Sequence, residues 1–408
     1  MRLLWAAAAI GLLVVFLMAY VCQVYRVDSG SMRPTIFGGR AQPDVERQDE
    51  WVLVRFQDAP LPERFDLVVF RSENGGDPMV KRVVGLPGEE IFIFEGDLFI
   101  GGELLPAGTP RPAPIPVFDD RYQVLEEYFE YKRATEFEKS PWTHEVAATR
   151  GLDARDVPPG SQQGMMLYHP DLRDSHLDRD GRRHPGLRQV NDGAIECQFQ
   201  IREALPDAAL RFRLVEEGDS FEVELSGFET AGEEAKLAVL RILRWNPETL
   251  SREQGRPRRD VLTEVPVNVP PKDWIHIRFT NIDNVLTVES PELRVKVRAT
   301  YEQNVPYPGR KRAGDKSIGH RVAFGGEQVR AGFRAVRVLR DLFYTDVGSN
   351  ATERPLLIGR DRCFVLGDNS AFSTDSRHFG PIELSRLVAR PMAIVWPKPR
   401  WLESVELP

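Results

Sequence analysis

The sequence is poor in cysteine and carries no excess of basic residues, and each shortage excludes a class of protein. Only three cysteines occur among 408 residues, at Cys22, Cys197 and Cys363, so the fold does not depend on a disulfide framework. A single Cys197–Cys363 bridge stays open. The 54 basic and 61 acidic residues are mixed along the chain and give a net charge of −7. Because nucleic-acid-binding domains favour a basic face, nucleic acid is not expected as the main partner.

Potential metal ligands are also few and poorly spaced. The cysteines and the seven histidines are scattered without the spacing of a ligand set, so we expect no metal and no cofactor. The segment DLRDSHLDRDGRRHPG (171–186) suggests a calcium loop at first sight. That interpretation fails, because the loop would need His176 at its first position and Leu187 as its closing glutamate. A solvated loop is the expectation there.

One long stretch near the N-terminus lacks charge altogether. The 22 residues from Leu3 to Val24 contain no charged side chain, and as a helix they would span roughly 33 Å, enough to cross the apolar core of a bilayer. A cleavable signal peptide would have a shorter apolar region and a small-x-small cleavage site. We therefore expect residues 3–24 to be an uncleaved transmembrane anchor.

After this segment the chain reads as a β protein. Short runs rich in β-branched and aromatic residues are separated by Pro, Gly and Asp, as is typical of strands. The segment GDLFIGGELL that follows them suits a tight hairpin. The runs are WVLVRF (51–56), DLVVF (66–70), MVKRVV (79–84) and EIFIF (90–94).

A proline-rich stretch then marks a boundary. Five prolines in residues 106–116 predict a stiff, extended linker. Residues 119–190 are highly charged, and the pattern of YQVLEEYFEYKRATEFEK (122–139) predicts an amphipathic helix. Residues 191–345 return to short strands, with one apolar and one mostly polar face in 274–279. This pattern predicts a β-sandwich. The segment KDWIHIRF (272–279) followed by NVLTVE (284–289) resembles the sandwiches of the concanavalin or laminin-G type.

The C-terminal residues again contain short β-branched and apolar runs separated by turn residues, like those of the first strands. The expected architecture is therefore mainly β, with one domain built from 27–112 plus 354–408 and a second domain, 113–353, inserted into it.

Three segments contain side chains suited to catalysis. Ser31 follows the apolar run, but a serine hydroxyl is a weak nucleophile without a base. Lys81 shares one face of its predicted strand with Met79 and Val83, and apolar surroundings lower the pKa of a lysine. The third segment, LGDNSAFSTDSRHFG (366–380), has turn residues and acid–base pairs. Each segment alone is equally typical of a turn, a surface lysine or a polar loop.

Four motifs occur in a fixed order after the apolar run: SGSMRPT, RFDLVVF, VKRVVGLPGE and GDNSAFSTDSRHFG. In this order they resemble the bacterial type I signal peptidases, membrane-bound Ser–Lys endopeptidases that trim exported precursors. The resemblance covers about 1–110 and 360–400. It implies a signal-peptidase β fold, signal-peptide-bearing preproteins as substrates, and a catalytic domain at the outer surface of the cell membrane, in contact with lipid.

The resemblance also implies roles for individual residues. Ser31 would be the nucleophile and Lys81 the general base, with the Ser29 hydroxyl and the Ser31 amide forming the oxyanion hole. Ser373 would orient the lysine. Supporting positions would be Met32, Pro34, Asp368, Asn369 and the ion pair of Asp375 with Arg377. Three departures bear on substrate preference: Asp28 stands where proline is common, Phe65 where glycine is common, and NSAFS (369–373) where a more polar stretch is common.

Two other classes of function stay open. One is a membrane-anchored binding protein with an inert peptidase domain, and the other is a Ser–Lys self-cleaving regulator. The inserted domain could bind a glycan or a protein, or could only shield the peptidase, since a fold does not define a function.

Overall fold

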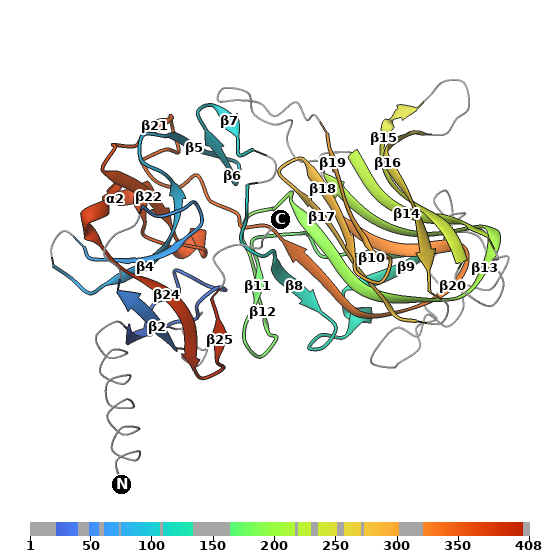
Figure 1. Cartoon of the computed structure of the whole chain (residues 1–408), viewed down its shortest axis with the longest axis horizontal. Helices are drawn as coiled ribbons and strands as arrows, with labels where there is room; N and C mark the ends of the chain where they lie inside the picture. Colours follow the sequence, from blue (N-terminus) through green and yellow to red (C-terminus); the bar gives the residue numbers. More distant parts are fainter. Residues whose placement is uncertain are drawn as a thin grey trace, which may run out of the picture. The chain divides into compact units, whose positions relative to one another are not determined.

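The chain forms two compact units, each built mainly from β-strands (Figure 1). The computed structural model describes residues 22–39, 49–56, 61–72, 75–106, 109–133, 164–216, 219–229, 236–250, 257–270, 273–301 and 321–402. Unit 1 comprises Met1–Ala113 and Leu342–Pro408, and unit 2 comprises Pro114–Asp341. The mainly β prediction is confirmed. Unit 2 ends at Asp341, whereas the sequence led us to expect the insertion to end at 353.

Unit 1 contains an eight-stranded antiparallel sheet in the order β1-β2-β24-β3-β4-β22-β23, with β25 paired to β24. Strands from both ends of the chain alternate in it, so neither end can complete the sheet alone. The bounds are β1 (Cys22–Val27), β2 (Glu50–Phe56), β3 (Leu67–Phe70), β4 (Met79–Gly85), β22 (Arg362–Leu366), β23 (Ile382–Glu383), β24 (Leu387–Trp396) and β25 (Arg400–Trp401).

A smaller sheet and several short helices complete unit 1. The smaller sheet has the order β21-β5-β6-β7, and the predicted GDLFIGGELL hairpin is confirmed as β6 and β7. The bounds are β5 (Glu90–Phe94), β6 (Asp97–Ile100), β7 (Glu103–Leu104), β21 (Leu356–Leu357), η3 (Ser370–Phe372), α2 (Ser376–Phe379) and η4 (Leu384–Arg386).

The main sheet of unit 1 has an apolar cluster on each face. Successive residues of a strand point to opposite faces, so neighbouring positions of β3 divide between the clusters. Leu67 and Val69 pack with Met32 in one cluster, whereas Val68 and Phe70 pack in the other. This arrangement fixes the orientation of each residue in β3 and β4.

Unit 2 is a β-sandwich formed from one continuous antiparallel network. Its strands follow the order β16-β15-β14-β13-β17-β18-β19, and β20 joins β13 to β8 and β10. The bounds are β8 (Ile115–Asp119), η1 (Leu125–Glu127), β9 (Phe129–Arg133), β10 (Gly164–Tyr168), β11 (His176–Leu177), β12 (Arg183–His184), β13 (Gly193–Glu216), β14 (Asp219–Glu229), β15 (Lys236–Leu250), β16 (Pro257–Val269), β17 (Ile275–Ile282), β18 (Val285–Ser290), β19 (Val295–Thr300) and β20 (Val322–Arg340).

The long strand β13 belongs to both layers of the sandwich. Its first part, 193–199, pairs with β17, and its last part, 209–216, pairs with β14. Register shifts between 201 and 209 separate the two parts, and such irregularities bend a strand. The long curved strands are visible in Figure 1. The core between the layers is rich in phenylalanine, including Phe199, Phe212, Phe221, Phe279 and Phe324. The alternation predicted for 274–279 is confirmed by the burial pattern of β17.

Two sequence predictions for unit 2 are wrong, and the question of a Cys197–Cys363 bridge is answered. The predicted helix at 122–139 is replaced in its described part by η1 and β9, because residues 129–133, in which aromatic and charged residues alternate, pair with β10 as a strand. The segment 171–186 contains the hairpin of β11 and β12, with buried side chains, and is not a solvated loop. Cys197 and Cys363 are free, buried thiols and form no bridge.

Most of the predicted anchor, 3–24, lies outside the described residues. Its last three residues, 22–24, form the start of β1, which pairs with β2. Among the residues that the structure describes, no helix has the length and apolar character needed to cross a membrane.

Removing a large side chain from the core of unit 2 tests whether the two units have separate cores. We expect Phe279→Ala to lower the unfolding free energy of unit 2 by roughly 3–5 kcal/mol, because Phe279 is fully buried. Hydrogen exchange should accelerate throughout β13 and β17 and stay unchanged in β3 and β4. Thr280→Ala, one residue along the same strand, is the control and should cost less than about 1 kcal/mol. Equal acceleration in both units would contradict separate cores.

Candidate active site

Ser31 lies at the start of a tight turn that follows β1. The next residue, Met32, has no exposed surface and packs against Val52 and Leu67 in the core of unit 1. The Ile36 amide donates to the Met32 carbonyl at 2.9 Å and closes the turn. Ser31 itself is only half-buried. The buried methionine therefore anchors the turn and leaves the adjacent hydroxyl accessible.

The next part of the turn is held by Arg33. Its guanidinium donates to the carbonyls of Gly38 and Gly39 at 2.8–3.2 Å. A side chain at Gly38 would meet the Ser29 and Val27 carbonyls at 2.5 and 2.6 Å, so only glycine fits there. Pro34, between Arg33 and Thr35, is half-buried and stiffens the turn.

Lys81 reaches the Ser31 hydroxyl from the middle of β4. Its Nζ lies 2.7 Å from Ser31 Oγ and 3.2 Å from the Val80 carbonyl. The residue is only 4% exposed, and the neighbouring Met79 and Val83 pack in an apolar cluster with Val68. This surrounding is the one that the alternation of β4 predicts.

Burial of the amine changes its acidity. Loss of hydration disfavours the ammonium form and lowers the pKa of Lys81 to about 8, although the carboxylates of Asp375 and Asp368 act in the opposite direction. At neutral pH roughly a tenth of the amine is therefore uncharged. An uncharged amine beside a hydroxyl can accept its proton, whereas an ammonium cannot.

Ser29 brings a second hydroxyl to the same place. Its side chain is exposed, and its Oγ lies 3.5 Å from Ser31 Oγ. An accessible hydroxyl at this separation can donate to an oxygen atom bound next to Ser31. The geometry is compatible with the oxyanion-hole role that the sequence resemblance implies.

Asn369 connects the C-terminal part of unit 1 to the Ser31 turn. Its backbone amide donates to the Ser31 carbonyl at 3.0 Å, and its side-chain amide donates to the Gly30 carbonyl at 2.9 Å. Close by, a side chain at Gly367 would meet the Ser31 carbonyl at 2.5 Å and Ser373 Oγ at 2.2 Å. The GDN segment thus fits against the turn only because Gly367 has no side chain.

A buried ion pair that the sequence analysis missed supports this contact. Arg82 donates through Nε and Nη2 to the two carboxylate oxygens of Asp368, at 2.8 and 2.7 Å, and through Nη1 to the Phe65 carbonyl at 2.9 Å. The Thr35 hydroxyl also donates to Asp368. Both charged side chains are almost fully buried. Arg82 follows Lys81 in β4 and therefore points to the opposite face of the sheet. This alternation is the only feature of the sequence that could have indicated the ion pair.

The Phe65 carbonyl is presented by an unusual backbone conformation. Phe65 has a φ of 69°, in the region that favours glycine. Glycine is the residue that the motif resemblance leads us to expect at this position. The phenylalanine side chain is buried, with 3% exposure. Core packing therefore compensates for the strained backbone.

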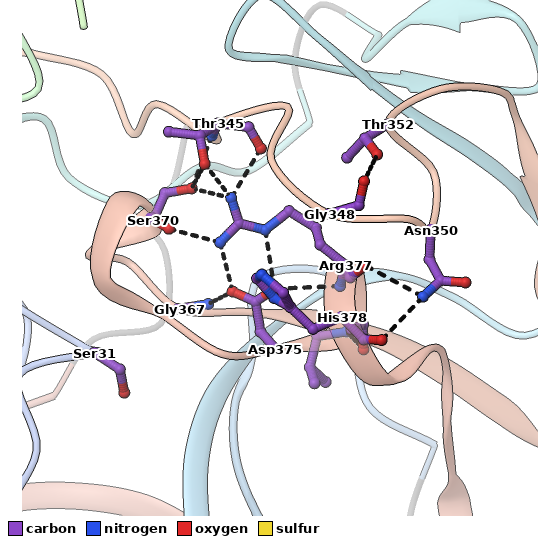
Figure 2. Close-up of polar contacts among 12 residues, drawn as sticks. Ser31, Thr345, Gly348, Asn350, Thr352, Gly367, Ser370, Asp375, Arg377 and His378 are labelled. Carbon is purple, nitrogen blue, oxygen red and sulfur yellow. Dashed lines mark hydrogen bonds and ion pairs between the residues drawn. The ribbon is translucent and has the colours of Figure 1, made fainter. Parts of the chain in front are cut away.

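Asp375 and Arg377 form a second buried pair at the start of α2. Arg377 Nε and Nη2 donate to the two oxygens of Asp375 at 2.9 and 2.8 Å, and neither side chain is exposed. Figure 2 shows this pair and the surrounding polar contacts. Asp375 also accepts from the Gly367 amide at 3.1 Å. The pair of Asp375 and Arg377 thus holds the backbone of Gly367, which lies against the Ser31 carbonyl.

The rest of the Arg377 guanidinium is satisfied by nearby oxygens (Figure 2). Nη1 donates to the Thr345 carbonyl and to the hydroxyls of Thr345 and Ser370, and Nη2 donates to the Ser370 carbonyl. Asn350 donates to the Arg377 carbonyl at 3.2 Å. Thr345 and Asn350 come from the part of unit 1 that follows unit 2, so this segment belongs to the site. The domain boundary expected at residue 353 instead assigns both residues to the insertion.

One candidate, Ser373, is not brought into the expected contact with Lys81. The Ser373 hydroxyl is buried, but it has no hydrogen-bond partner among the described residues, Lys81 included. His378 is half-exposed, and its Nδ1 lies 4.0 Å from Asp375 Oδ1. Within the described residues of unit 1, no three potential metal ligands converge around Ser31.

The two kinds of ion pair in unit 1 differ in burial, and this difference can be measured. We expect Arg82→Met to lower the unfolding free energy by roughly 3–5 kcal/mol, because it leaves Asp368 as an unpaired buried charge. Arg362→Met removes a pair whose side chains are 41% and 45% exposed, and should cost about 0–1 kcal/mol. Urea denaturation of both variants measures the difference. Similar losses in the two variants would contradict the structural role of Arg82.

Comparison with known proteins supports the same motifs. The family model "Signal peptidase, peptidase S26" matches residues 1–163 and 316–396. The probable signal peptidase I-2 of Synechocystis sp. is 30% identical over 126 residues, 28% of this chain and 54% of that protein. The mitochondrial inner membrane protease subunit 1 of Schizosaccharomyces pombe is 32% identical over 72 residues, 18% of this chain and 45% of that protein. The chain spans about half the length of these curated relatives.

Solved structures give only weak alignments. The carbohydrate-binding module CBM66 from Bacillus subtilis aligns with a TM-score of 0.26 and 11% identity, covering 52% of this chain and 96% of that one. The polysaccharide lyase family 18 structure aly-SJ02 aligns with a TM-score of 0.27 and 8% identity, covering 53% and 96%. At these scores the alignments carry no inference. The family match spans more than half of the chain in two segments separated by residues 164–315, and the chain therefore belongs to the signal peptidase S26 family.

Proposed function

We propose that this protein is a membrane-bound serine endopeptidase that removes N-terminal signal peptides from exported preproteins. The contact of 2.7 Å between Lys81 Nζ and Ser31 Oγ, with the lysine 4% exposed, carries the proposal. Membership of the signal peptidase family supports exported preproteins as the substrate class. The reaction uses Ser31 as nucleophile and Lys81 as general base.

In the first half of the reaction, uncharged Lys81 accepts the Ser31 proton while Ser31 Oγ attacks the carbonyl carbon of the scissile bond. Collapse of the tetrahedral intermediate breaks the C–N bond. The Lys81 ammonium then returns its proton to the leaving amine, and Ser31 carries the acyl group. This sequence needs an amine with a pKa near the working pH, which the burial of Lys81 provides.

In the second half, a water molecule replaces the leaving amine. Lys81 accepts a proton from the water as its oxygen attacks the ester carbonyl carbon. The second tetrahedral intermediate releases Ser31, which takes the proton back from Lys81. The dyad returns to its starting state, and the C-terminal carboxylate of the signal peptide leaves.

Both intermediates carry a negative oxygen that needs hydrogen-bond donors. The proposed donors are the Ser29 hydroxyl and the Ser31 amide, and the position of Ser29 Oγ next to Ser31 Oγ supports the first. Loss of one donor in such a site typically costs roughly 2.7–4 kcal/mol of activation free energy.

The supporting residues position this dyad. Asn369 fixes the Ser31 turn through two hydrogen bonds. Asp368 and Asp375 are bound by arginines, and their charges raise the pKa of Lys81 and so limit the effect of burial. In this proposal Ser373 orients Lys81 when substrate binds, which its buried, unpartnered hydroxyl would permit.

The location of the reaction is proposed as the outer surface of the cell membrane. The uncharged run 3–24 would be the anchor, and it continues directly into β1. Exposed tryptophans lie on three successively paired strands of the same sheet as β1: Trp51 on β2, Trp396 on β24 and Trp401 on β25, with exposures of 41%, 63% and 73%. Tryptophan is enriched at membrane–water interfaces, so these side chains support contact with lipid.

Substitution of the dyad tests the proposal directly. We expect Ser31→Ala to abolish cleavage of a signal-peptide-bearing precursor in detergent, and Lys81→Arg to reduce it at least a thousandfold, since arginine stays protonated. Ser29→Ala should reduce the rate roughly 100–1,000-fold and retain some activity. Gel analysis of precursor cleavage in trans measures all three.

Normal cleavage by Lys81→Arg would contradict the assignment of the base. Cleavage of this chain alone, with no cleavage in trans, would indicate a self-cleaving regulator. No cleavage by the unaltered protein would indicate a binding protein.

The pH dependence tests the state of Lys81. Because the uncharged amine is the active form, kcat/KM should rise with pH, reach half its maximum near pH 8 and level off above it. Ser29→Ala is the matched control: it should lower the plateau and leave the midpoint in place. A midpoint close to 10.5, the ordinary pKa of lysine, would show that the amine is hydrated in the free enzyme.

A further inference from the structure

The hairpin of β11 and β12 in unit 2 gathers polar side chains that the peptidase mechanism does not use. His176 and His184 are directly paired across it, and their rings stack with centroids 5.0 Å apart. Asp178 at the hairpin turn has a fully buried side chain, accepts from the Arg182 amide at 2.9 Å and lies 3.3 Å from His184 Nε2. The carboxylate is thus engaged by its own turn and by one imidazole.

Arg183 lies between these residues and has no carboxylate partner. Its Nη2 donates to Ser175 Oγ over a long distance of 3.4 Å. Its Nε is buried and has no acceptor, and no acidic oxygen among the described residues lies within ion-pair distance of the guanidinium. A guanidinium group carries a positive charge, and Arg183 is half-buried. Leaving such a charge without an anion is costly.

A second arginine adds positive charge to the same place. Arg340 Nε donates to the carbonyl of Ser175, the residue whose hydroxyl contacts Arg183, at 2.7 Å. Arg340 Nη2 donates to the Asp174 carbonyl at 3.1 Å. Both guanidinium groups therefore donate to the short segment that leads into β11, Arg183 to the Ser175 hydroxyl and Arg340 to two backbone carbonyls.

A buried phenol provides a further unused donor. The Tyr168 ring packs against Phe118 and Phe129 in the core, and the residue has no exposed surface. Its hydroxyl has no hydrogen-bond partner among the described residues. Burial raises the pKa of Tyr168 to about 12, and the positive charge of Arg183 acts against that shift. The Arg183 charge is therefore near enough to act on the Tyr168 hydroxyl.

We propose that this part of unit 2 is a binding site for an oxyanion, in which Arg183 and Tyr168 donate hydrogen bonds to a carboxylate or phosphate group. Guanidinium groups bind both anions through paired N–H donors. The ligand would satisfy the buried Nε, the unpaired charge and the phenol hydroxyl together. The site is independent of the proposed peptidase reaction, since all its residues lie in unit 2.

Titration of the full-length protein in detergent tests the site. We would add inorganic phosphate, galacturonate or neutral galactose at constant ionic strength, and follow the melting of unit 2 and the heat of binding. At least one of the two anions should raise the melting temperature, and galactose should not. Preference for phosphate or for galacturonate identifies the source of the oxyanion.

A matched pair of arginine variants separates a specific site from general salt effects. Arg183→Gln should weaken binding at least tenfold. Arg182→Gln removes the same charge from the adjacent, exposed position and should leave binding unchanged. Equal weakening of anion binding in the two variants would overturn the proposal. So would a titration in which neither phosphate nor galacturonate binds.

A matched pair of tyrosine variants tests the buried donor. Removal of an unpaired buried hydroxyl is neutral or stabilising, whereas removal of a paired one is destabilising. Tyr168→Phe should therefore keep or raise the melting temperature of the ligand-free protein and weaken anion binding several-fold. Tyr128→Phe is the control, because its ring stacks on Tyr168 and its hydroxyl accepts from Gln123 at 3.1 Å; it should lower the melting temperature and leave binding intact. A lower melting temperature for Tyr168→Phe with unchanged binding would assign a purely structural role to the hydroxyl.

Discussion

The proposed chemistry depends on keeping one lysine dry while it touches one serine. Water around Lys81 would restore its ordinary pKa, and the amine would then carry a proton at neutral pH. Apolar neighbours in β3 and β4 exclude water from the stem, while the Ser31 turn closes over the amine. The turn is itself held by Met32 in the core and by Asn369. Burial and contact are therefore produced by the same packing.

Charge around the dyad is arranged so that this burial is tolerable. Two carboxylates, Asp368 and Asp375, favour the ammonium form of Lys81, yet each is paired with a buried arginine. The paired guanidinium groups give each buried carboxylate two hydrogen bonds, so neither carboxylate depends on the lysine for a partner. The amine consequently keeps a pKa of about 8 instead of falling much lower. The two ion pairs also hold the backbone next to the nucleophile. Arg82 binds Asp368, and Arg377 binds Asp375, which accepts from the Gly367 amide.

Ser31 and Lys81 could be selected from the sequence because short motifs in a fixed order carry them. The alternation of β4 also gave the environment of Lys81 correctly. The ion pair of Arg82 with Asp368 could not be predicted, since its partners are separated by the whole of unit 2. The prediction of a helix at 122–139 is wrong because residues 129–133 pair with β10. Pairing with a strand distant in the sequence outweighs the local helical pattern there. Likewise, the charge of 171–186 suggested a loop, although the hairpin satisfies those polar groups internally.

The division of unit 1 by the insertion has a consequence for the order of synthesis. Ser31 and Lys81 are made before unit 2, whereas Asn369, Asp375 and Arg377 are made after it. A nascent chain that has emerged only as far as the sandwich lacks the strands β22 and β24 and the clamp on the serine turn. The dyad would therefore stay unassembled during translation, and any proteolytic competence would arise only when the last seventh or so of the polypeptide joins the sheet.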